Sequence, residues 1–306
     1  MKYFIVLLSV LFLTGSLQAQ LPRASVGHIH RLNDFPSKYV SARSVDIWLP
    51  EGYDSTKRYA VLYMHDGQML FDSTTSWNKQ EWGMDEIAQQ LISQKKVAPF
   101  IIVGIYNTGA YRHSEYFPEK PLQFLDAGLS DTLLKVALMG KARADAYLKF
   151  LTSELKPYVD QHFSTYTDAR HTSIMGSSMG GLISLYAICE YPQIFGNAAC
   201  LSTHWPGLFT ANDPIPDAFN RYLKENAPDP ASHRIYFDYG TATLDALYEP
   251  YQARIDATMK QHGFIKKKNW ITLKFPGEEH SERAWSKRAT IPLQFLMKAT
   301  ARGKEK

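Results

Sequence analysis

Cysteine, net charge and long apolar runs are all scarce in this sequence. Only 2 of its 306 residues are cysteine, which excludes a disulfide-rich scaffold and allows at most one disulfide. The formal net charge is only +4, which is too small to indicate binding to nucleic acid. Beyond the N-terminus, no apolar run reaches the length needed to cross a bilayer. We therefore expect a soluble protein without a nucleic-acid or membrane partner.

The one marked apolar run stands at the N-terminus. Lys2 is followed by an apolar stretch from Tyr3 to Leu13 and then by small and polar residues up to Ala19. This order is typical of a secretory signal peptide, and the apolar stretch is short for a membrane span. We expect cleavage after Ala19, which would remove residues 1–19 and export the mature chain to the periplasm or the medium.

Both cysteines fall inside expected secondary structure. Cys189 lies late in an expected helix, and Cys200 lies in the apolar strand "NAACLS". We interpret both as small buried hydrophobic residues, and a disulfide between them is the alternative.

The rest of the chain alternates between strand-like and helical stretches. Apolar runs such as "YAVLYMHDG" and "FIIVGIYN" are separated by helical stretches such as "ADAYLKFLTSELKPYVDQHF". This alternation predicts an α/β fold, with a mostly parallel sheet covered by helices on both faces. We assign residues 20–300 to a single α/β domain. Residues 121–144 are expected to form a cap over the site, and residues 301–306 a disordered tail.

Two adjacent serines lie within a Gly-x-Ser-x-Gly pattern. The pattern places Gly176 and Gly180 two residues to either side of Ser178. Ser177 is not centred, because methionines stand where its glycines would be needed. Glycine is needed at both positions because a strand that turns directly into a helix brings the flanking backbone very close.

The flanks of this pattern match the elbow that carries a catalytic serine. A short β-branched and apolar stretch begins at Thr172, and apolar residues at helical spacing follow the motif until Pro192. A strand, a sharp turn and a helix in this order expose the serine hydroxyl on a rigid corner. The sequence therefore predicts Ser178 as a nucleophile.

A serine nucleophile needs a positioned base, and His280 is the best candidate. It lies in "WITLKFPGEEHSERAWSKR", between the last expected strand and the last helix, where the base of this arrangement belongs. His171 lies back along the strand before the elbow, and His233 and His262 lie at element ends facing away from the site. We interpret these three as structural.

The acid that would orient the histidine has two candidates in "RIYFDYGTATLD". Asp238 alternates with its neighbours inside the expected strand, whereas Asp245 follows the flexible "GTAT" and opens the next helix. A carboxylate beyond the strand end can reach the histidine more readily. We therefore choose Asp245 and keep Asp238 as the alternative.

Ester or amide chemistry also needs N–H donors for the oxyanion. The backbone N–H of Met179, next to the nucleophile, is one expected donor, and that of Gln68 is the second because Gly67 allows close approach. His65 and Asp66 are an alternative pair of metal ligands, but no other ligand-type residue clusters with them. We expect no metal.

Four segments together resemble a known family. These are "VLYMHDGQMLFD", "IMGSSMGGLISLYAICEYPQIFG", "FDYGTATLDALYEPYQ" and "EEHSERAWSKR". They resemble the "Putative esterase" family, which groups esterase D, the enterochelin (ferric siderophore) esterases and the acetylxylan and feruloyl esterases of carbohydrate esterase family 1. The resemblance extends from about Ser44 to Met297.

This resemblance implies an α/β-hydrolase fold, ester hydrolysis through an acyl-enzyme, and no cofactor. It assigns the nucleophile to Ser178, the base to His280 and the oxyanion donors to Gln68 and Met179. The acid transfers less well, because the family varies in that loop.

Two further stretches are expected to shape a substrate pocket. Arg112, Glu115 and Tyr116 follow a central strand and are placed to face an acidic or hydroxylated substrate, with an ion-paired loop as the alternative. His204 and Trp205 follow the strand after the elbow and are placed to stack on a sugar or aromatic ring, with buried packing as the alternative.

The leading hypothesis is an exported serine esterase that cleaves acyl groups from a carbohydrate or a small hydroxylated compound. A siderophore ester hydrolase and an acyltransferase to a sugar are alternatives within enzymes. A binding protein that kept the fold and lost activity is the alternative from another class. The sequence names neither the acyl group, the alcohol nor the oligomeric state.

Overall fold

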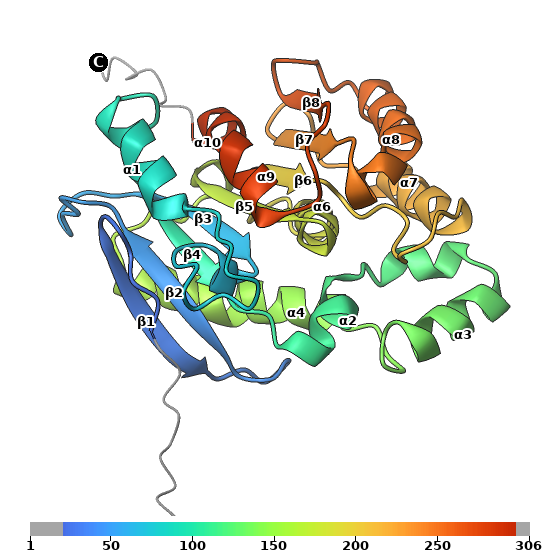
Figure 1. Cartoon of the computed structure of the whole chain (residues 1–306), viewed down its shortest axis with the longest axis horizontal. Coiled ribbons are helices and arrows are strands. Elements are labelled where there is room, and N and C mark those ends of the chain that lie inside the picture. The colour runs from blue at the N-terminus through green and yellow to red at the C-terminus, as the bar shows by residue number, and fades with distance from the viewer. Residues whose placement is uncertain (1–20, 298–306) are drawn as a thin grey trace, which may run out of the picture.

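The computed structural model describes residues 21–297, which form one eight-stranded sheet with helices on both faces (Figure 1). The predicted signal peptide, residues 1–19, and the predicted tail, residues 301–306, lie outside the described residues. None of the helices in the described part of the chain is long and apolar enough to cross a membrane.

The strands follow the order β1-β2-β4-β3-β5-β6-β7-β8 across the sheet. The first two pairings, β1 with β2 and β2 with β4, are antiparallel, and every later pairing is parallel. The predicted mostly parallel sheet is confirmed. The strands are β1 (His28–Phe35), β2 (Arg43–Leu49), β3 (Ala60–His65), β4 (Phe100–Ile105), β5 (Thr172–Ser177), β6 (Asn197–Leu201), β7 (Arg234–Gly240) and β8 (Trp270–Phe275).

Ten α-helices are found within residues 21–297. They are α1 (Met84–Ser93), α2 (Arg112–Tyr116), α3 (Ala127–Val136), α4 (Ala144–Phe150), α5 (Lys156–His162), α6 (Met179–Glu190), α7 (Pro214–Asn226), α8 (Glu249–Gln261), α9 (Glu282–Arg288) and α10 (Thr290–Leu296). A π-helical turn, Leu151–Leu155, joins α4 to α5, so the expected long helix forms in three pieces.

The sheet separates two hydrophobic cores, and β4 shows why. Its residues are all buried, but Ile101 and Val103 belong to one core while Phe100 and Ile102 belong to the other. Successive side chains of a strand point to opposite faces, so a strand covered on both sides is apolar throughout. Fully burying one such side chain contributes about 1.5–3 kcal/mol.

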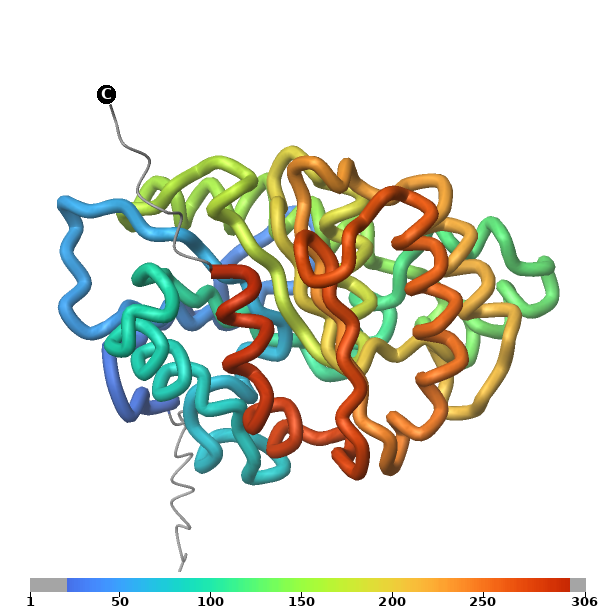
Figure 2. The backbone as a smooth tube through the Cα atoms, turned by 90° about the horizontal axis from the view of Figure 1, so that it is seen from above, coloured from blue at the N-terminus to red at the C-terminus, as the bar shows by residue number. Residues whose placement is uncertain are grey.

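Different helices cover the two faces. Helices α1, α9 and α10 supply apolar residues to one core, and α1 lies beside α10 (Figure 1, Figure 2). Helices α4 to α8 supply the other core. Both cysteines lie in that second core as unpaired thiols, and burial raises the pKa of the Cys189 thiol. The interpretation of both cysteines as buried small hydrophobic residues is confirmed.

The segment 121–144 contains α3 and lies at the end of the molecule opposite α1 (Figure 1). It is anchored by Leu133 and Leu138, which are buried in the larger core. The 3-10 turn Lys120–Phe124, where the segment begins, contacts α7. Its role as a cap over the site stays a prediction, as does the single-domain assignment of residues 20–300.

Candidate active site

The turn between β5 and α6 holds Ser178 in a strained conformation. Ser178 has φ 58° and ψ −123°, a backbone conformation that residues other than glycine rarely adopt. It stands between the last residue of β5 and the first residue of α6. A Cβ atom on Gly176 would lie 2.7 Å from the carbonyl oxygen of Gly180. Glycine is therefore required at position 176 by close backbone contact across the turn.

The helix that follows presents its N-terminus to this corner. Met179 is the first residue of α6, so its N–H has no acceptor within the helix. The aligned peptide dipoles of a 12-residue helix also make this end positive. The corner is thus suited to hold a negative charge that develops on a substrate oxygen.

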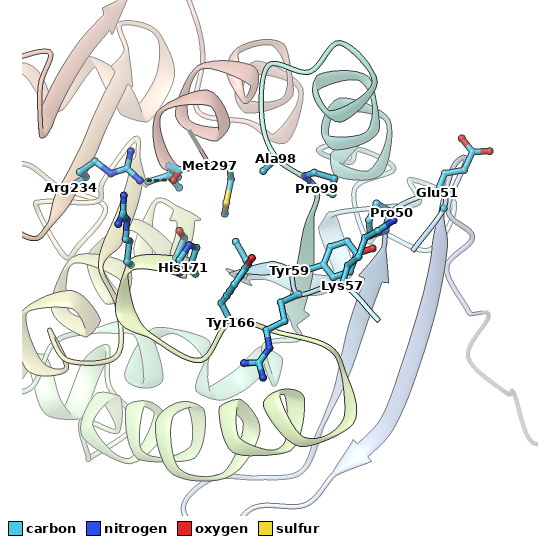
Figure 3. A pocket seen from close by; sticks show the side chains of 16 residues that line it. Pro50, Glu51, Lys57, Tyr59, Ala98, Pro99, Tyr166, His171, Arg234 and Met297 are labelled. Atoms are coloured by element: carbon cyan, nitrogen blue, oxygen red, sulfur yellow. Dashed lines mark hydrogen bonds between the residues drawn. The ribbon is translucent and has the colours of Figure 1, made fainter. Parts of the chain in front are cut away.

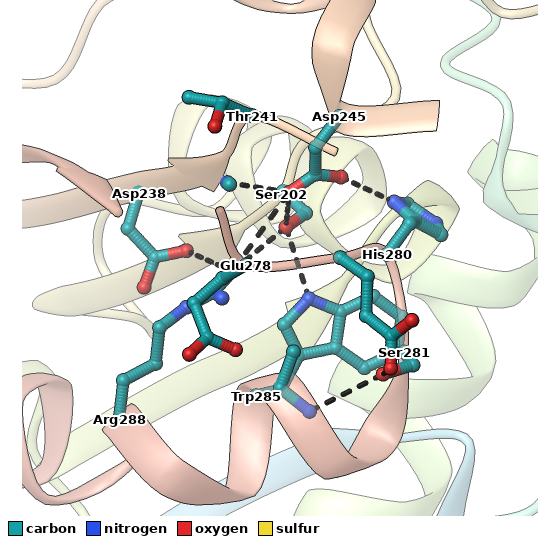
Figure 4. Close-up of polar contacts among 12 residues, drawn as sticks. Ser202, Asp238, Thr241, Asp245, Glu278, His280, Ser281, Trp285 and Arg288 are labelled. Carbon is teal, nitrogen blue, oxygen red and sulfur yellow. Dashed lines mark hydrogen bonds and ion pairs between the residues drawn. The ribbon is translucent and has the colours of Figure 1, made fainter. Parts of the chain in front are cut away.

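His280 and Asp245 form a direct side-chain pair at the same edge of the sheet (Figure 4). The His280 Nδ1 and Asp245 Oδ1 atoms are 2.6 Å apart. The backbone N–H of His280 donates to Thr243 Oγ1 at 2.9 Å, which fixes the loop that carries the imidazole. With Nδ1 engaged by the carboxylate, Nε2 is the ring nitrogen left to exchange a proton with a substrate or nucleophile.

Asp238 has different partners. It is buried inside β7, where its carboxylate accepts from Arg288 Nη2 at 3.0 Å and from the hydroxyl of Tyr236 at 2.8 Å. Burial raises its pKa, against the opposing effect of Arg288. The structure therefore places Asp245, and not Asp238, against His280.

Ser202 was not singled out from the sequence, yet it connects these groups. Its hydroxyl donates to Asp245 Oδ2 at 2.6 Å and accepts from Trp285 Nε1 and Arg288 Nη2, each at 2.9 Å (Figure 4). Trp285 and Arg288 are three residues apart on α9, a spacing that puts them on one helix face. That spacing was the available signal, but only the fold shows that the face meets the end of β6.

The strand pairing also joins this network to the elbow. The backbone N–H of Ser178 donates to the carbonyl of Leu201 at 2.9 Å, and Ser202 follows Leu201 directly. The carbonyl of Ser178 accepts from the N–H of His204 at 3.2 Å. The elbow, the carboxylate partner of His280 and the residues after β6 therefore belong to one hydrogen-bonded corner of the sheet.

The loop after β3 packs against this corner. A Cβ atom on Gly67 would lie 2.5 Å from the carbonyl carbon of Gly104, and one on Gly180 would lie 3.4 Å from the Cβ of His65. Gln68 is the second residue of a 3-10 turn, η1 (Gly67–Met69), so its N–H has no acceptor within that turn. Gln68 thus lies within a 3-10 turn and Met179 at the start of α6, both at the same edge of the sheet.

Arg112 is held beside this loop by Asp66. Its Nε and Nη2 atoms lie 2.7 Å from the two carboxylate oxygens, and Asn107 Nδ2 donates to Asp66 Oδ1 at 2.7 Å. Burial opposes ionisation of Asp66, but Arg112 and Asn107 outweigh it and hold its pKa below the usual value. The Arg112 side chain keeps 31% of its surface exposed, so it is both ion-paired and open to solvent.

Glu115 and Tyr116 do not face solvent. Glu115 is buried and makes two hydrogen bonds with Arg43, at 2.7 and 2.9 Å. Tyr116 is buried in the core. Glu115 is therefore ion-paired and Tyr116 is packed in the core, so these two residues do not face a substrate as predicted, and the alternative of an ion-paired loop holds.

His204 and Trp205 are both buried. Trp205 packs against Phe237 and donates its indole N–H to Gln252 at 3.1 Å, so its ring lies in the core and not on an open surface. His204 Nδ1 lies 2.8 Å from the Tyr248 hydroxyl, and its Nε2 is buried without a partner in the described part of the chain. Burial, together with the nearby His280, lowers the pKa of His204 to about 3.

The possible metal ligands have partners of their own. His65 Nδ1 lies 2.8 Å from the Tyr147 hydroxyl, and burial lowers the pKa of His65 to about 3. Asp66 is engaged by Arg112. Within residues 21–297, no three His, Cys, Asp or Glu side chains are grouped to hold a metal ion.

The three histidines that we interpret as structural stand at the ends of elements away from this edge. His171 precedes β5 and pairs with Asp168, and His233 precedes β7 and contacts the carbonyl of Pro192. His262 caps the C-terminus of α8. His171 and His233 thus stand at the amino ends of their strands, opposite the elbow, and His262 stands at the end of α8.

The family of this chain is shown by a sequence model described as "Putative esterase", which matches residues 39–287. One relative is the uncharacterized protein YbbA of Bacillus subtilis, 26% identical over 165 residues, which are 53% of this chain and 58% of YbbA. Another is an endo-1,4-beta-xylanase/feruloyl esterase of Xylanibacter ruminicola, 28% identical over 182 residues, which are 58% of this chain and 22% of that protein. The chain therefore spans less than two thirds of either relative.

A solved structure supports the fold. The enterobactin esterase FES from Shigella flexneri matches with a TM-score of 0.65 at 17% identity, over 90% of this chain and 60% of that one. The predicted α/β-hydrolase fold is confirmed. The family model spans most of the chain and includes the Gly-x-Ser-x-Gly elbow, Asp245 and His280, and this protein therefore belongs to the "Putative esterase" family.

Proposed function

We propose that this protein is a serine carboxylic-ester hydrolase in which Ser178, His280 and Asp245 form the catalytic triad. The observation that carries the proposal is the 2.6 Å contact between His280 and Asp245 at the edge where the strained elbow presents Ser178. Family membership supports the same reaction class.

The proposed reaction begins with proton transfer from Ser178 to His280. Asp245 accepts the Nδ1–H of His280, which leaves Nε2 unprotonated and able to take the Ser178 proton as Oγ attacks the ester carbonyl. His280 then gives this proton to the departing alcohol, and an acyl-enzyme remains. Water attacks the acyl carbon with the help of Nε2, releasing the carboxylic acid and restoring Ser178.

The N–H groups of Gln68 and Met179 are the proposed oxyanion donors. Neither has an acceptor within its own helical turn, and the two turns pack together at the elbow. Preorganised donors of this kind stabilise the transition state, each by about 3–4 kcal/mol in a well-studied protease.

The proposed substrate is an acyl ester of a carbohydrate or a small hydroxylated compound. Arg112 keeps an exposed guanidinium beside the oxyanion loop, and His204 offers an unpaired, neutral Nε2 close to His280. We propose both as substrate contacts, whereas Trp205, whose ring is buried against Phe237, is not one. The feruloyl esterase named among the relatives favours an ester attached to a carbohydrate.

Export is a further part of the proposal. It rests on the Lys2, apolar and small-residue pattern of residues 1–19 alone, because these residues lie outside the described structure.

Two serine variants test the proposal. We expect Ser178→Ala to abolish hydrolysis of p-nitrophenyl acetate, because loss of the triad serine costs about a millionfold in kcat in a well-studied protease. Ser177→Ala is the matched control and should retain most activity, since Ser177 is a buried strand residue paired with Leu201. Near-normal turnover by Ser178→Ala would refute the assignment.

A substrate panel then separates the alternatives. Acetylated xylan and methyl ferulate test carbohydrate-linked acyl groups, and ferric enterobactin tests a siderophore ester. Acyl transfer to added sugar in place of release to water would indicate an acyltransferase. A folded chain inactive on the whole panel would indicate a binding protein.

A further inference from the structure

A cavity of about 300 Å³ lies at the edge of the sheet opposite the proposed active site (Figure 3). It is formed by the loop between β2 and β3, the residues just before β4 and β5, the start of β7 and the end of α10. The triad uses the carboxyl ends of the parallel strands, whereas this cavity opens at their amino ends. The proposed reaction gives it no role.

Positive charge dominates the lining. Four cationic side chains line the cavity, Lys57, Arg58, Arg170 and Arg234, against the single carboxylate of Glu51. Lys57 has an exposed partner in Asp54 at 3.1 Å. Among residues 21–297, none of the three arginines makes an ion pair.

Among these cations, Arg234 gives the strongest indication of a bound anion, because it is half-buried. Its guanidinium donates only to neutral acceptors: Asn197 Oδ1 at 2.9 Å and the carbonyls of Phe295 and Leu296 at 2.9 and 2.8 Å. Burial and the nearby Arg170 lower its pKa. Arg234 is half-buried without a counter-charge, and the exposed Arg170 beside it adds a second positive charge. Burying an unpaired charge is costly, and a bound anion would offset that cost.

Aromatic rings supply the other part of the wall. Tyr59 is buried in the wall of the cavity, and Tyr166 lies beside His171 (Figure 3). The Tyr166 and His171 rings are stacked, with centroids 4.3 Å apart. Pro50 and Pro99 add apolar surface. A ligand that fits this lining combines an anionic group with a flat or cyclic body.

We propose that this cavity binds a small organic anion that carries a carboxylate on a ring. Arginine pairs with carboxylates through two parallel hydrogen bonds, and tyrosine rings offer faces to an aromatic or sugar ring. The volume is at the lower end of the range for small-molecule sites. An aromatic acid and a sugar acid share this chemistry, and the inference does not depend on the proposed esterase activity.

Calorimetric titration of the full protein with benzoate and, separately, with glucuronate tests the site. We expect one of these to bind and its neutral counterpart, benzamide or glucose, to bind far less. Arg170→Gln should weaken binding about tenfold, the effect of one charge-assisted hydrogen bond. Arg221→Gln, on the exposed face of α7, is the matched control and should leave binding unchanged.

The outcomes separate cleanly. Preference for benzoate assigns an aromatic acid, and preference for glucuronate assigns a sugar acid. Arg170→Gln should also keep the wild-type rate on p-nitrophenyl acetate, which shows that the variant is folded and the triad intact. The proposal is overturned if neither anion binds, or if Arg58→Gln and Arg170→Gln both bind the anion as tightly as wild type.

Discussion

At the residue scale, the orientation of the Asp245 carboxylate is set by its hydrogen-bond partners. Its Oδ2 accepts from the Ser202 hydroxyl at 2.6 Å and from the N–H of Gly240 at 2.5 Å, which leaves Oδ1 for His280. A carboxylate held by three donors has one orientation. His280 is therefore presented in one tautomer, with Nε2 directed away from the acid.

Replacing each candidate acid by asparagine distinguishes them. We expect Asp245→Asn to lower kcat by about a hundredfold or more, because the amide favours the wrong tautomer of His280, a change that cost a triad protease about ten-thousandfold. Asp238→Asn should change kcat much less. It should instead lower the melting temperature, since it removes the nearer of the two carboxylates that face the buried Arg288 and leaves only Asp245, at 4.0 Å.

Steady-state kinetics and thermal melts of both variants measure these effects, with circular dichroism confirming the fold. A larger loss of kcat in Asp238→Asn than in Asp245→Asn would reverse the assignment.

Ser202 is predicted to act as a positioning residue through Asp245. Ser202→Ala removes the donor to Asp245 Oδ2 and leaves Trp285 and Arg288 without their shared acceptor. We expect kcat to fall about tenfold with little change in KM, in keeping with the loss of one or two buried hydrogen bonds. The NMR resonance of the His280 Nδ1 proton should also move.

Ser173→Ala is the matched control, because Ser173 is a buried serine at the other end of β5. It should leave both kcat and the Nδ1 resonance unchanged. If Ser202→Ala behaves like Ser173→Ala in both measurements, Ser202 has no positioning role.

At the element scale, α1 is tied to the N-terminal part of the described chain by one buried carboxylate. Asp85, in the first turn of α1, accepts from the N–H groups of Ser25 at 2.6 Å and Val26 at 3.3 Å. Burial, together with the neighbouring Glu86, raises the pKa of Asp85 to about 7. Asp85 Oδ1 has no partner within residues 21–297, so the protonated form suits this site.

This raised pKa predicts a pH-dependent stability. The folded state binds the Asp85 proton more tightly than the unfolded state, so its contribution is fully present below about pH 4 and is lost as pH rises through about 7. Asp85→Asn has no such proton to lose. We expect the variant to gain about 2 kcal/mol in free energy of unfolding relative to wild type between pH 5 and pH 8.

Urea unfolding at both pH values measures the difference. Asp131→Asn, at an exposed position of α3, is the control and should follow the wild type at both values. An Asp85→Asn variant that also follows the wild type would show that Asp85 is ionised in the folded protein across this range.

At the scale of the whole molecule, the sheet separates two functions that we propose. The triad residues follow the ends of β5, β7 and β8, and the cationic cavity occupies the opposite edge, where β3, β4, β5 and β7 begin. Because β5 runs from one site to the other, ligand binding at one edge and catalysis at the other share a rigid, buried element.

Processing is the remaining prediction at this scale. If residues 1–19 are a signal peptide, the exported protein should begin at Gln20. Intact-mass analysis of the protein recovered outside the cytoplasm gives the answer directly. A mass that still includes residues 1–19 would contradict cleavage after Ala19.

The sequence alone was sufficient for the features that local chemistry determines. The alternation of apolar runs predicted a parallel sheet covered on both faces, and the glycines around Ser178 predicted a strand that turns sharply into a helix. Both follow from short-range rules: side-chain period along a strand, and the absence of room for a Cβ atom in a tight turn. The motifs around Ser178 and His280 were the most specific parts of the resemblance to the family.

The tertiary structure decided what depends on contacts between distant segments. Asp238 and Asp245 both lie between Ser178 and His280 in the chain, where the acid is expected. Only the packing of α9 against β7 shows that Arg288 donates a hydrogen bond to Asp238. Ser202 lies 43 residues from Asp245 in the chain, and no local pattern pairs them. The burial of Trp205 and the gathering of Arg170 with Arg234 likewise arise from how strands far apart in the sequence align in the sheet. Side-chain partners across such distances are set by packing, which a linear pattern does not contain.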